Sequence, residues 1–372
     1  MKKIRLGDIA TLITKGTTPT TIGFSFVDTG VNFVKIESIS ENGEFLSDKF
    51  AHITDECDNK LKRSQLEEND ILFSIAGAIG RTAIVPRSIL PANTNQALAI
   101  IRIPQNAINL RFVLYALQSQ AVEEQSEKQK QGVAQLNLSL KNIADILIPL
   151  VSSEKQDEIV RNLAAVDTAI AIRKEQIRLI DQVVKSRFIE LFGDPQRNPH
   201  GYKHTKLSDI ATYYNGLTYK PENVAAEGTI VLRSSNIQNS QLDFADTIRV
   251  DCAIKERLIV QKNDILMCSR NGSAKLVGKV ALIKDIQEPM SFGAFMMIIR
   301  SHYFGYLMTY FQMDAFRQQI KTGATTTINQ ITGRMLDDVT IPLPPMALVD
   351  QFAAFVEQTD KSKLCGKMGV AA

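Results

Sequence analysis

The sequence has 372 residues, of which 44% are hydrophobic and 22% charged, so it is long enough for two domains with ordinary cores. Its 43 basic and 40 acidic side chains give a net charge of only +3, so a nucleic-acid partner would have to meet a local basic surface. No apolar run is long enough to span a bilayer, and Met1–Asp8 lacks the apolar stretch of a signal peptide. The scattered Cys57, Cys252, Cys268 and Cys365 have neither metal nor redox spacing and predict reduced thiols in a cytoplasmic protein.

In chain order, the first part is predicted to open with a short helix or strand and to continue through a turn and several short strands to a helix. These segments are Leu6–Leu12, the turn Gly16–Pro19, the strands Val31–Ile36, Ile71–Ile75, Ala83–Val85 and Ala97–Ile103, and the helix from Leu110 to about Gln131. The same series returns later as Leu207–Tyr213, Gly216–Pro221, the strands Ile230–Leu232, Ile265–Cys268, Val280–Ile283 and Phe295–Ile299, and the helix from Tyr303 to about Lys321. Each part is therefore predicted to be a mixed α+β domain, with bounds 1–150 and 194–345.

The two parts are copies of each other, displaced by about 200 residues, which is too long a period for a solenoid and indicates a duplicated domain with its connector. The matching segments are Leu6–Thr11 with Leu207–Thr212, Asn69–Leu72 with Asn263–Leu266, Gly80–Val85 with Gly278–Ile283, Ile101–Arg102 with Ile299–Arg300, and Ile148–Leu150 with Ile341–Leu343.

The connector, 151–193, predicts one long helix. Ser153 and Gln156 stand at capping-box spacing, and Gly193 before Asp194-Pro195 ends the helix. Apolar residues recur at alternating steps of four and three, as in a coiled-coil seam of roughly five heptads. The seam residues are Ile159, Leu163, Val166, Ile170, Ile177, Ile180, Val184 and Leu191. The alternative, a helix packed on a globular core, would need a wider apolar stripe.

A second helix is predicted within 346–372, where Phe352 and Val356 repeat the seam positions of Ile159 and Leu163. Its pattern fades near Lys363, and Cys365–Gly369 is not helical in character, so this helix is expected to be shorter than the first. A truncated, rearranged or fragment chain would show this pattern. Seam residues such as Ile177 and Val184 would then lack a partner in the chain, so association with another chain or a second copy is expected.

Motifs of the common enzyme classes are missing from the sequence. Asn198-Pro199-His200 lacks the second proline and the aromatic residue of an adenine methyltransferase motif, and Gly272–Val280 has the wrong spacing for a phosphate loop, so it predicts a glycine-bearing turn. The four histidines share no spacing with cysteines or carboxylates, and no nucleophile elbow occurs. A duplicated enzyme should repeat its catalytic residues, whereas mostly apolar scaffold repeats here. We therefore expect neither catalytic residues nor a metal site.

The repeated openings, the Asn-Asp-Ile-Leu segments, the Ile-Pro-Leu segments before a heptad helix, and Phe188–Pro195 before the second copy resemble the specificity subunit of type I restriction-modification systems. The resemblance covers nearly the whole chain. It implies two tandem target-recognition domains separated by conserved helices that form an antiparallel coiled coil, with each domain reading one half of a bipartite DNA site.

The resemblance also implies partners. The helices would dock methyltransferase subunits, a motor-nuclease subunit could join, and S-adenosylmethionine, ATP and Mg²⁺ would bind to those partners only. Two fused, diverged copies fit unlike half-sites better than a palindrome, and their fusion raises the effective concentration of the second contact.

Candidate DNA contacts are polar and basic residues in turns whose position repeats while their residues differ, because base edges and phosphates select such side chains. In the first copy they are Lys15, Thr17, Thr18, Lys35, Ser38, Arg81, Asn95 and Gln96. In the second they are Tyr219, Lys220, Arg233, Ser235, Asn236, Arg270, Asn271, Lys275 and Lys279. Lys35 and Arg233 are the leading pair, since both position and basicity repeat. For each residue the alternative is a solvated loop.

Two other classes of function remain open on the sequence alone. One is a non-catalytic scaffold whose helices assemble proteins and whose domains bind peptide or glycan, which the low net charge allows. The other is a stand-alone nuclease. Salt-sensitive DNA binding would favour recognition over scaffolding, and cleavage of DNA with Mg²⁺ by the chain alone would indicate the nuclease.

Overall fold

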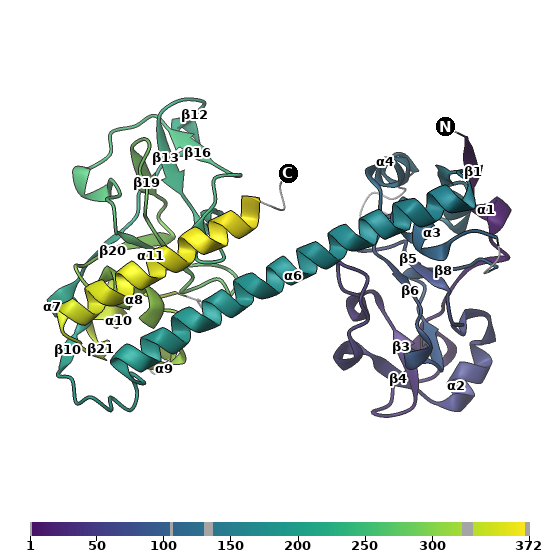
Figure 1. Cartoon of the computed structure of the whole chain (residues 1–372), viewed down its shortest axis with the longest axis horizontal. Helices are drawn as coiled ribbons and strands as arrows, with labels where there is room; N and C mark the ends of the chain where they lie inside the picture. The colour runs from purple at the N-terminus through teal and green to yellow at the C-terminus, as the bar shows by residue number, and fades with distance from the viewer. Residues whose placement is uncertain (1, 105–106, 130–136, 322–329, 369–372) are drawn as a thin grey trace. The chain divides into compact units, whose positions relative to one another are not determined.

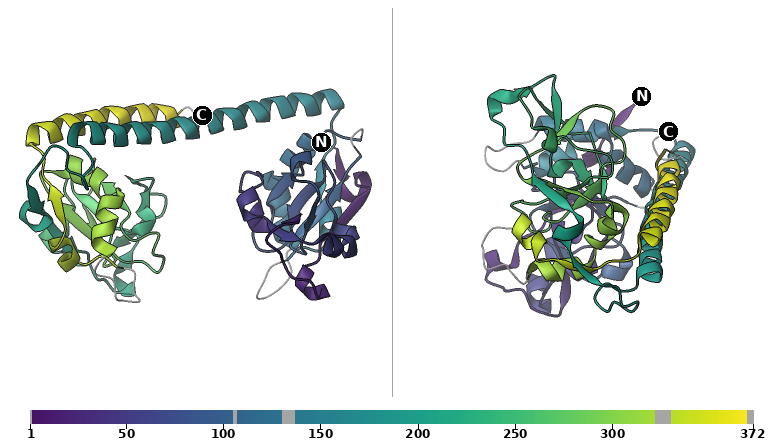
Figure 2. Two further views of the ribbon diagram at one scale, coloured as in Figure 1. Left: turned by 90° about the horizontal axis from the view of Figure 1, so that it is seen from below. Right: turned by 90° about the vertical axis from the view of Figure 1, so that its left-hand side faces the viewer.

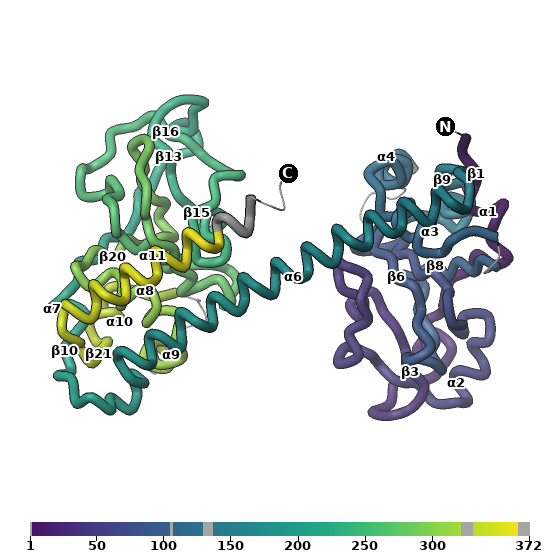
Figure 3. The backbone as a smooth tube through the Cα atoms, in the orientation of Figure 1, coloured from purple at the N-terminus to yellow at the C-terminus, as the bar shows by residue number. Residues whose placement is uncertain are grey.

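The computed structural model describes residues 2–104, 107–129, 137–321 and 330–368. The chain forms two compact units, Met1–Ala169 and Ile170–Ala372, and the boundary falls inside the long helix α6 (Ser153–Phe192). The backbone of each unit can be followed in Figure 3. The predicted class, two tandem α+β domains, is confirmed.

Each unit is built on an antiparallel four-stranded sheet with the same strand order. In unit 1 the order is β2 (Leu12–Lys15), β8 (Leu98–Arg102), β5 (Ile71–Ser74) and β6 (Thr82–Ile84), and in unit 2 it is β11 (Thr212–Asn215), β20 (Met296–Arg300), β17 (Ile265–Cys268) and β18 (Val280–Leu282). The register repeats as well, since Leu12 pairs with Arg102 and Thr212 with Arg300. The duplication seen in the sequence is therefore a duplication of fold.

Both faces of these sheets are buried, which explains their almost continuous apolar runs. In β5, Ile71 and Phe73 face one core and Leu72 faces another. In β17, Ile265 and Met267 face one core, while Leu266 and Cys268 face the other. This alternation follows from the two-residue period of a strand.

A second sheet covers one face in each unit, and it contains one parallel strand pair. In unit 1 it has the order β4 (Ala51–Ile53), β3 (Val31–Val34) and β7 (Ala92–Thr94), with β3 parallel to β7. In unit 2 the order is β12 (Val224–Ala225), β16 (Ile248–Val250), β13 (Thr229–Leu232) and β19 (Met290–Phe292), with β13 parallel to β19. Because parallel strands end on the same side, the loops after β3 and β7 lie together, as do those after β13 and β19.

Apart from the long helix α11, the remaining elements are short. Two-stranded ladders join β1 (Lys3–Arg5) to β9 (Leu147–Pro149), β10 (His204–Lys206) to β21 (Thr340–Pro342), and β14 (Ile237–Gln238) to β15 (Gln241–Leu242). The other helices are α1 (Leu6–Ile9), α2 (Asp55–Lys60), α3 (Leu110–Leu117), α4 (Gln120–Gln129), α5 (Leu140–Ala144), α7 (Leu207–Ile210), α8 (Phe304–Tyr310), α9 (Asp314–Lys321), α10 (Gly333–Asp337) and α11 (Met346–Met368). Within the described residues there are also eight 3₁₀ turns: Pro19–Ile22, Ile36–Ser38, Ser47–Lys49, Lys62–Ser64, Arg87–Ile89, Pro221–Asn223, Ser234–Asn236 and Glu256–Leu258.

Three predictions about helices are wrong in detail. Each single helix predicted after the strands is in fact two helices, α3 and α4 in unit 1 and α8 and α9 in unit 2. In unit 1 the break follows α3, where the Ser119 hydroxyl donates to the carbonyl of Ala116, and in unit 2 α8 ends at Tyr310. The end of the first predicted helix, near Gln131, lies outside the described residues. The cap of α6 is Ser152, whose hydroxyl accepts from the Lys155 amide. The Gln156 side chain instead accepts from the Asn109 backbone, so it ties α6 to α3.

The second long helix was predicted to fade near Lys363, whereas α11 continues to Met368. In unit 2 it runs antiparallel beside the second half of α6 (Figures 1 and 2). Phe188 and Phe192 pack against Phe352 with ring centroids 5.6 and 5.4 Å apart, and Lys363 donates to Asp181 at 2.5 Å. Val184, expected to lack a partner within the chain, packs against this cluster. These contacts within unit 2 support α11 as far as Lys363.

The end of α6 and the state of the cysteines agree with the sequence where the structure describes them. The predicted stop of α6 is confirmed, because Gly193 follows Phe192 with φ 73°, the left-handed conformation of a helix C-cap. Cys57, Cys252 and Cys268 carry free thiols, and the side chain of Cys365 lies outside the described residues. Among the described helices, none combines the length and the apolar character that crossing a membrane requires.

Candidate nucleic-acid interface

In unit 1, the loop after β2 crosses the end of β7 at very short range. The Gly16 amide donates to the carbonyl of Asn95, and a Cβ at Gly16 would lie only 1.8 Å from the carbonyl oxygen of Thr94. The Thr18 hydroxyl donates to Gln96 Oε1 at 2.5 Å. Two segments about 80 residues apart in the chain are thereby joined into one polar surface, which contains five of the predicted contacts: Lys15, Thr17, Thr18, Asn95 and Gln96.

Lys35 stands beside this surface because it follows β3, the parallel neighbour of β7. Its backbone amide donates to the hydroxyl of Ser38, which in turn donates to the carbonyl of Lys49. Its ammonium lies 4.5 Å from the ring centroid of Phe26 and 3.9 Å from Glu37. The half-buried Lys35 side chain therefore presents a point charge at the edge of the turn.

Two predicted contacts of unit 1 hold this turn from inside. Ser38 is 0% exposed, so it does not reach a ligand. The Arg81 guanidinium donates to the carbonyls of Ile36 and Ile39, at 3.2 and 2.8 Å. Burial therefore contradicts the predicted DNA contact of Ser38. The half-buried Arg81 helps to fix the turn after Lys35, and its DNA contact stays a prediction.

Unit 2 repeats the arrangement with different side chains. A Cβ at Gly216 would lie 2.2 Å from the carbonyl oxygen of Gly293, so the loop after β11 crosses the end of β19 as closely as its counterpart does. Arg233 follows β13, and its amide donates to the side chain of Asn236 at 2.8 Å. Asn236 is 1% exposed and takes the place of Ser38. It too has a structural role in place of the predicted contact.

A hollow of about 450 Å³ lies at this crossing in unit 2. Tyr219, Arg233 and Ser235 line it, together with Asp246 and Phe295, which were not among the predicted contacts. Phe295 is 59% exposed, and the Arg270 guanidinium lies 5.5 Å from its ring centroid. The sequence predicted Phe295 only as the first residue of a strand, aligned with Ala97 of the first copy. Nothing in the sequence indicated that its side chain is exposed. No pattern in the sequence pointed to Asp246.

Of the remaining candidates of unit 2, Asn271 contacts a residue that lines the hollow, whereas the others do not line it. Asn271 donates to the Ser234 hydroxyl at 3.3 Å, and exposed Lys220 pairs with Glu222 at 3.3 Å. Lys275 and Lys279 lie in the loop between β17 and β18 and do not line the hollow. In the same loop Gly278 has φ 82°, as expected for the predicted glycine-bearing turn.

Cys268 lies at the end of β17, and burial raises the pKa of its thiol, so the neutral form is favoured. Within the described ranges, no group of three or more histidine, cysteine, aspartate or glutamate side chains could hold a metal ion.

Replacing Arg81 with alanine should loosen the turn that carries Lys35. The change removes two charge-assisted hydrogen bonds to backbone carbonyls, and bonds of this kind contribute about 1.5–3 kcal/mol each. Because the guanidinium is only partly buried and water can replace part of what is lost, we expect unit 1 to lose less than the sum of the two bonds, about 2 kcal/mol of unfolding free energy, measured by denaturant titration. Arg87→Ala, an exposed arginine of the same unit, is the control. Equal stability of the two variants would contradict the structural role of Arg81.

The sequence matches the family "Type I restriction modification DNA specificity domain" over residues 1–182 and 199–364, which together are most of the chain. The chain therefore belongs to this family. The two matched segments correspond to the two copies of the fold, so one family domain accounts for each.

Curated relatives are similar over part of their length. The type I restriction enzyme EcoKI specificity subunit of Escherichia coli (strain K12) is 28% identical over 178 residues, which is 44% of this chain and 38% of that protein. The EcoBI specificity subunit of Escherichia coli is 35% identical over 136 residues, which is 36% of this chain and 28% of that protein. The matched region thus spans less than half of either relative.

Solved structures share the fold. The crystal structure of the type I restriction-modification S subunit from M. genitalium has a TM-score of 0.51 and 14% identity, covering 100% of this chain and 92% of that one. A chain from a structure on complex assembly and conformational transition of the type I R-M system has a TM-score of 0.51 and 17% identity, with the same coverage.

Proposed function

We propose that this chain is the sequence-specific DNA-binding subunit of a type I restriction-modification complex, and that each unit reads one half of a bipartite, asymmetric DNA site. The observation that carries the proposal is the repeated crossing of two loops beside a basic residue, at Lys35 and at Arg233. The scaffold of the crossing is the same in both units, while the exposed side chains differ. That combination suits two unlike half-sites.

The family supports the rest of the proposal. The chain contributes recognition and no catalysis, and methyltransferase subunits dock on its long helices. S-adenosylmethionine belongs to those subunits, and ATP and Mg²⁺ belong to the partner machinery that includes a motor-nuclease subunit. Exposed apolar residues of α6, such as Leu163 and Val166 at 39% and 54%, are suited to contact such a partner or a second copy of the chain.

Lys35→Ala and Arg233→Ala should each weaken binding to one half-site only. Each change removes a cation from the exposed edge of one crossing, and contacts of this kind to DNA contribute about 1–3 kcal/mol. We expect at least a severalfold loss of affinity for duplexes with the cognate half-site, measured by gel shift across a salt series. Arg197→Ala, whose side chain is 86% exposed and outside both crossings, is the matched control.

The outcomes separate the functions that the sequence left open. Salt-sensitive binding that falls in the two variants and not in the control supports recognition of DNA. Unchanged affinity in both variants at every salt concentration would contradict the assignment of the two crossings. A wild-type chain that binds no duplex, with or without a methyltransferase partner, would favour the protein scaffold instead.

A further inference from the structure

The hollow of unit 2 holds an arginine whose guanidinium is fixed before any ligand arrives. Arg233 Nη2 donates to Asp246 Oδ2 at 2.7 Å. The loop that carries Asp246 is fixed as well, because the buried Asn236 amide donates to the carbonyls of Asp243 and Asp246, both at 2.8 Å. Asn236 thus ties together the turn of Arg233 and the loop of its carboxylate partner. An arginine held in this way loses little conformational entropy when it binds.

The hydrogen-bonding capacity of this guanidinium is only partly used. Arg233 Nε is buried and has no hydrogen-bond partner in the structure, although a buried donor in a folded protein normally has one. The side chain as a whole remains 32% exposed and lines the open hollow. A ligand that brings acceptor atoms into the hollow would meet the exposed part of this guanidinium, because Nε itself is buried.

The charge of the pair indicates which part of DNA this ligand is. Asp246 has a side chain 64% exposed beside the arginine, so it repels a phosphate that approaches the hollow and largely cancels the positive charge of Arg233. A base edge carries acceptors without a net charge. Guanine offers two, O6 and N7, in the geometry that an arginine fork matches. The exposed ring of Phe295 forms an apolar wall that shields such a bond from water.

We propose that the Arg233–Asp246 pair reads one guanine of the half-site bound by unit 2, with Arg233 donating to O6 and N7 and Asp246 acting as its positioning residue. This assignment rests on the proposed function. Unit 1 has a different pair at this place: Lys35 stands at the position of Arg233, and its ammonium lies 3.9 Å from Glu37 and 4.5 Å from the ring centroid of Phe26. A lysine is a point charge without a fork, so the two units differ in how they read this position.

The test uses guanine that lacks N7. The full wild-type chain, alone and with its modification partner, is first used to select duplexes from a random library, which gives both half-sites. Each guanine in the selected duplex is then replaced singly by 7-deazaguanine, and binding is measured for wild type, Arg233→Ala, Asp246→Asn and Lys35→Ala. We expect wild type to lose about tenfold in affinity at one guanine, Arg233→Ala to lose nothing further there, and Lys35→Ala to behave like wild type at that position.

The Asp246→Asn variant tests whether the Asp246 carboxylate positions Arg233 or only fills space beside it. The substitution keeps the shape and removes a negative charge near DNA, so it should raise affinity for random duplexes while it reduces the discrimination against 7-deazaguanine. Undiminished discrimination in Arg233→Ala, or a selected site without guanine in the half-site of unit 2, would overturn the assignment and leave the proposed function intact. Selection of no specific duplex by wild type would overturn the proposed function, and the assignment with it.

Discussion

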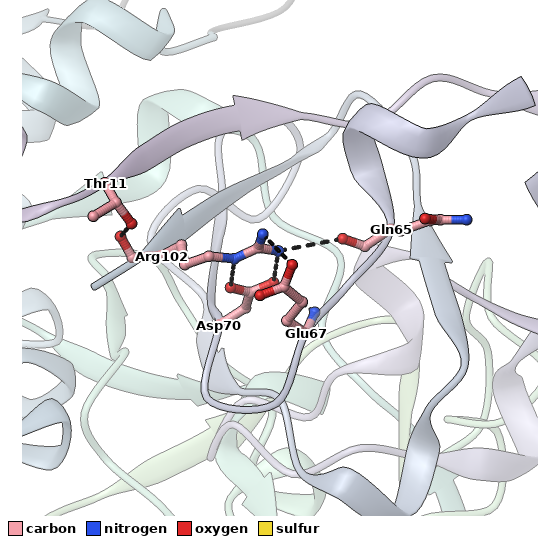
Figure 4. A network of polar contacts seen from close by, with 5 residues as sticks. All are labelled: Thr11, Gln65, Glu67, Asp70 and Arg102. Carbon is pink, nitrogen blue, oxygen red and sulfur yellow. Dashed lines mark hydrogen bonds and ion pairs between the residues drawn. The ribbon is translucent and has the colours of Figure 1, made fainter. Parts of the chain in front are cut away.

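Replacing Asp70 with alanine is expected to destabilise unit 1 by about 3–5 kcal/mol, because it removes the buried member of an ion pair and leaves the half-buried Arg102 guanidinium without its main partner. The Asp70 carboxylate is fully buried and accepts from Arg102 Nε and Nη2, at 2.7 and 2.8 Å, and from the backbone amide of Glu67 at 2.8 Å (Figure 4). The hydrogen bond to Asp70 also raises the pKa of Arg102, so the arginine stays charged. Asp264 and Arg300 repeat the pair in unit 2, at the same two distances.

The matched control is Glu67→Ala, because Glu67 also pairs with Arg102, at 2.5 Å, but its side chain is 64% exposed. An exposed ion pair contributes about 0–1 kcal/mol. Unit 2 has Gln261 at the place of Glu67, so Arg300 has no carboxylate from this position to pair with. Hydrogen exchange mapped to each unit would show global loss of protection in unit 1 for Asp70→Ala and in unit 2 for Asp264→Ala. Similar protection in Asp70→Ala and Glu67→Ala would contradict the dominance of the buried carboxylate.

The buried aspartate–arginine pair explains why the Asn-Asp-Ile-Leu and Ile-Arg segments repeat in both copies, which the sequence alone did not explain. Asn69 and Asn263 have φ 72° and 70°, a left-handed conformation that asparagine tolerates better than most residues. The following Asp70 and Asp264 bond to the arginines of the repeated Ile-Arg segments. The Asn-Asp and Ile-Arg repeats could both be recognised in the sequence. Nothing in their local sequence indicated that the aspartate bonds to the arginine, because that contact depends on the pairing of β5 with β8.

The fold could be predicted where the signal was periodic or duplicated. The long helix α6, its stop at Gly193 and the central strands followed from apolar spacing. The edge strands of two or three residues did not, since segments such as β12 are too short to show alternation. The breaks after α3 and α8 were also missed, because local capping interrupts an apolar pattern that continues through them.

The candidate interface could be predicted by position rather than by residue. Repeated turns with differing side chains led to Lys35 and Arg233, and both lie at the loop crossings. The same reasoning could not separate exposed residues from buried ones, so it included Ser38 and Asn236, which hold the turns. It missed Asp246 and Phe295 because their roles depend on tertiary contacts to Arg233 and Arg270.

Gly216→Ala is expected to disrupt the interface of unit 2 while leaving that of unit 1 intact. The added Cβ would lie 2.2 Å from the carbonyl oxygen of Gly293 and 2.4 Å from that of Phe292. Both are backbone atoms of the strand end, so the loop that carries Tyr219 must move away from β19. Overpacking of this kind costs about 1–3 kcal/mol. We expect an affinity loss of about tenfold for the half-site of unit 2, measured on duplexes in which only one half-site is cognate.

Gly272→Ala provides the comparison, because an added Cβ there meets no atom within 4 Å although the residue lies in another loop of the same unit. It should bind both half-sites like wild type. Gly16→Ala should give the mirror result, since its Cβ would lie 1.8 Å from the carbonyl oxygen of Thr94 in unit 1. If Gly216→Ala and Gly16→Ala each weakened both half-sites equally, the two crossings would not be independent readers. Opposite half-site losses would show that the close approach of each loop to its strand end places the DNA-contacting side chains of that unit alone.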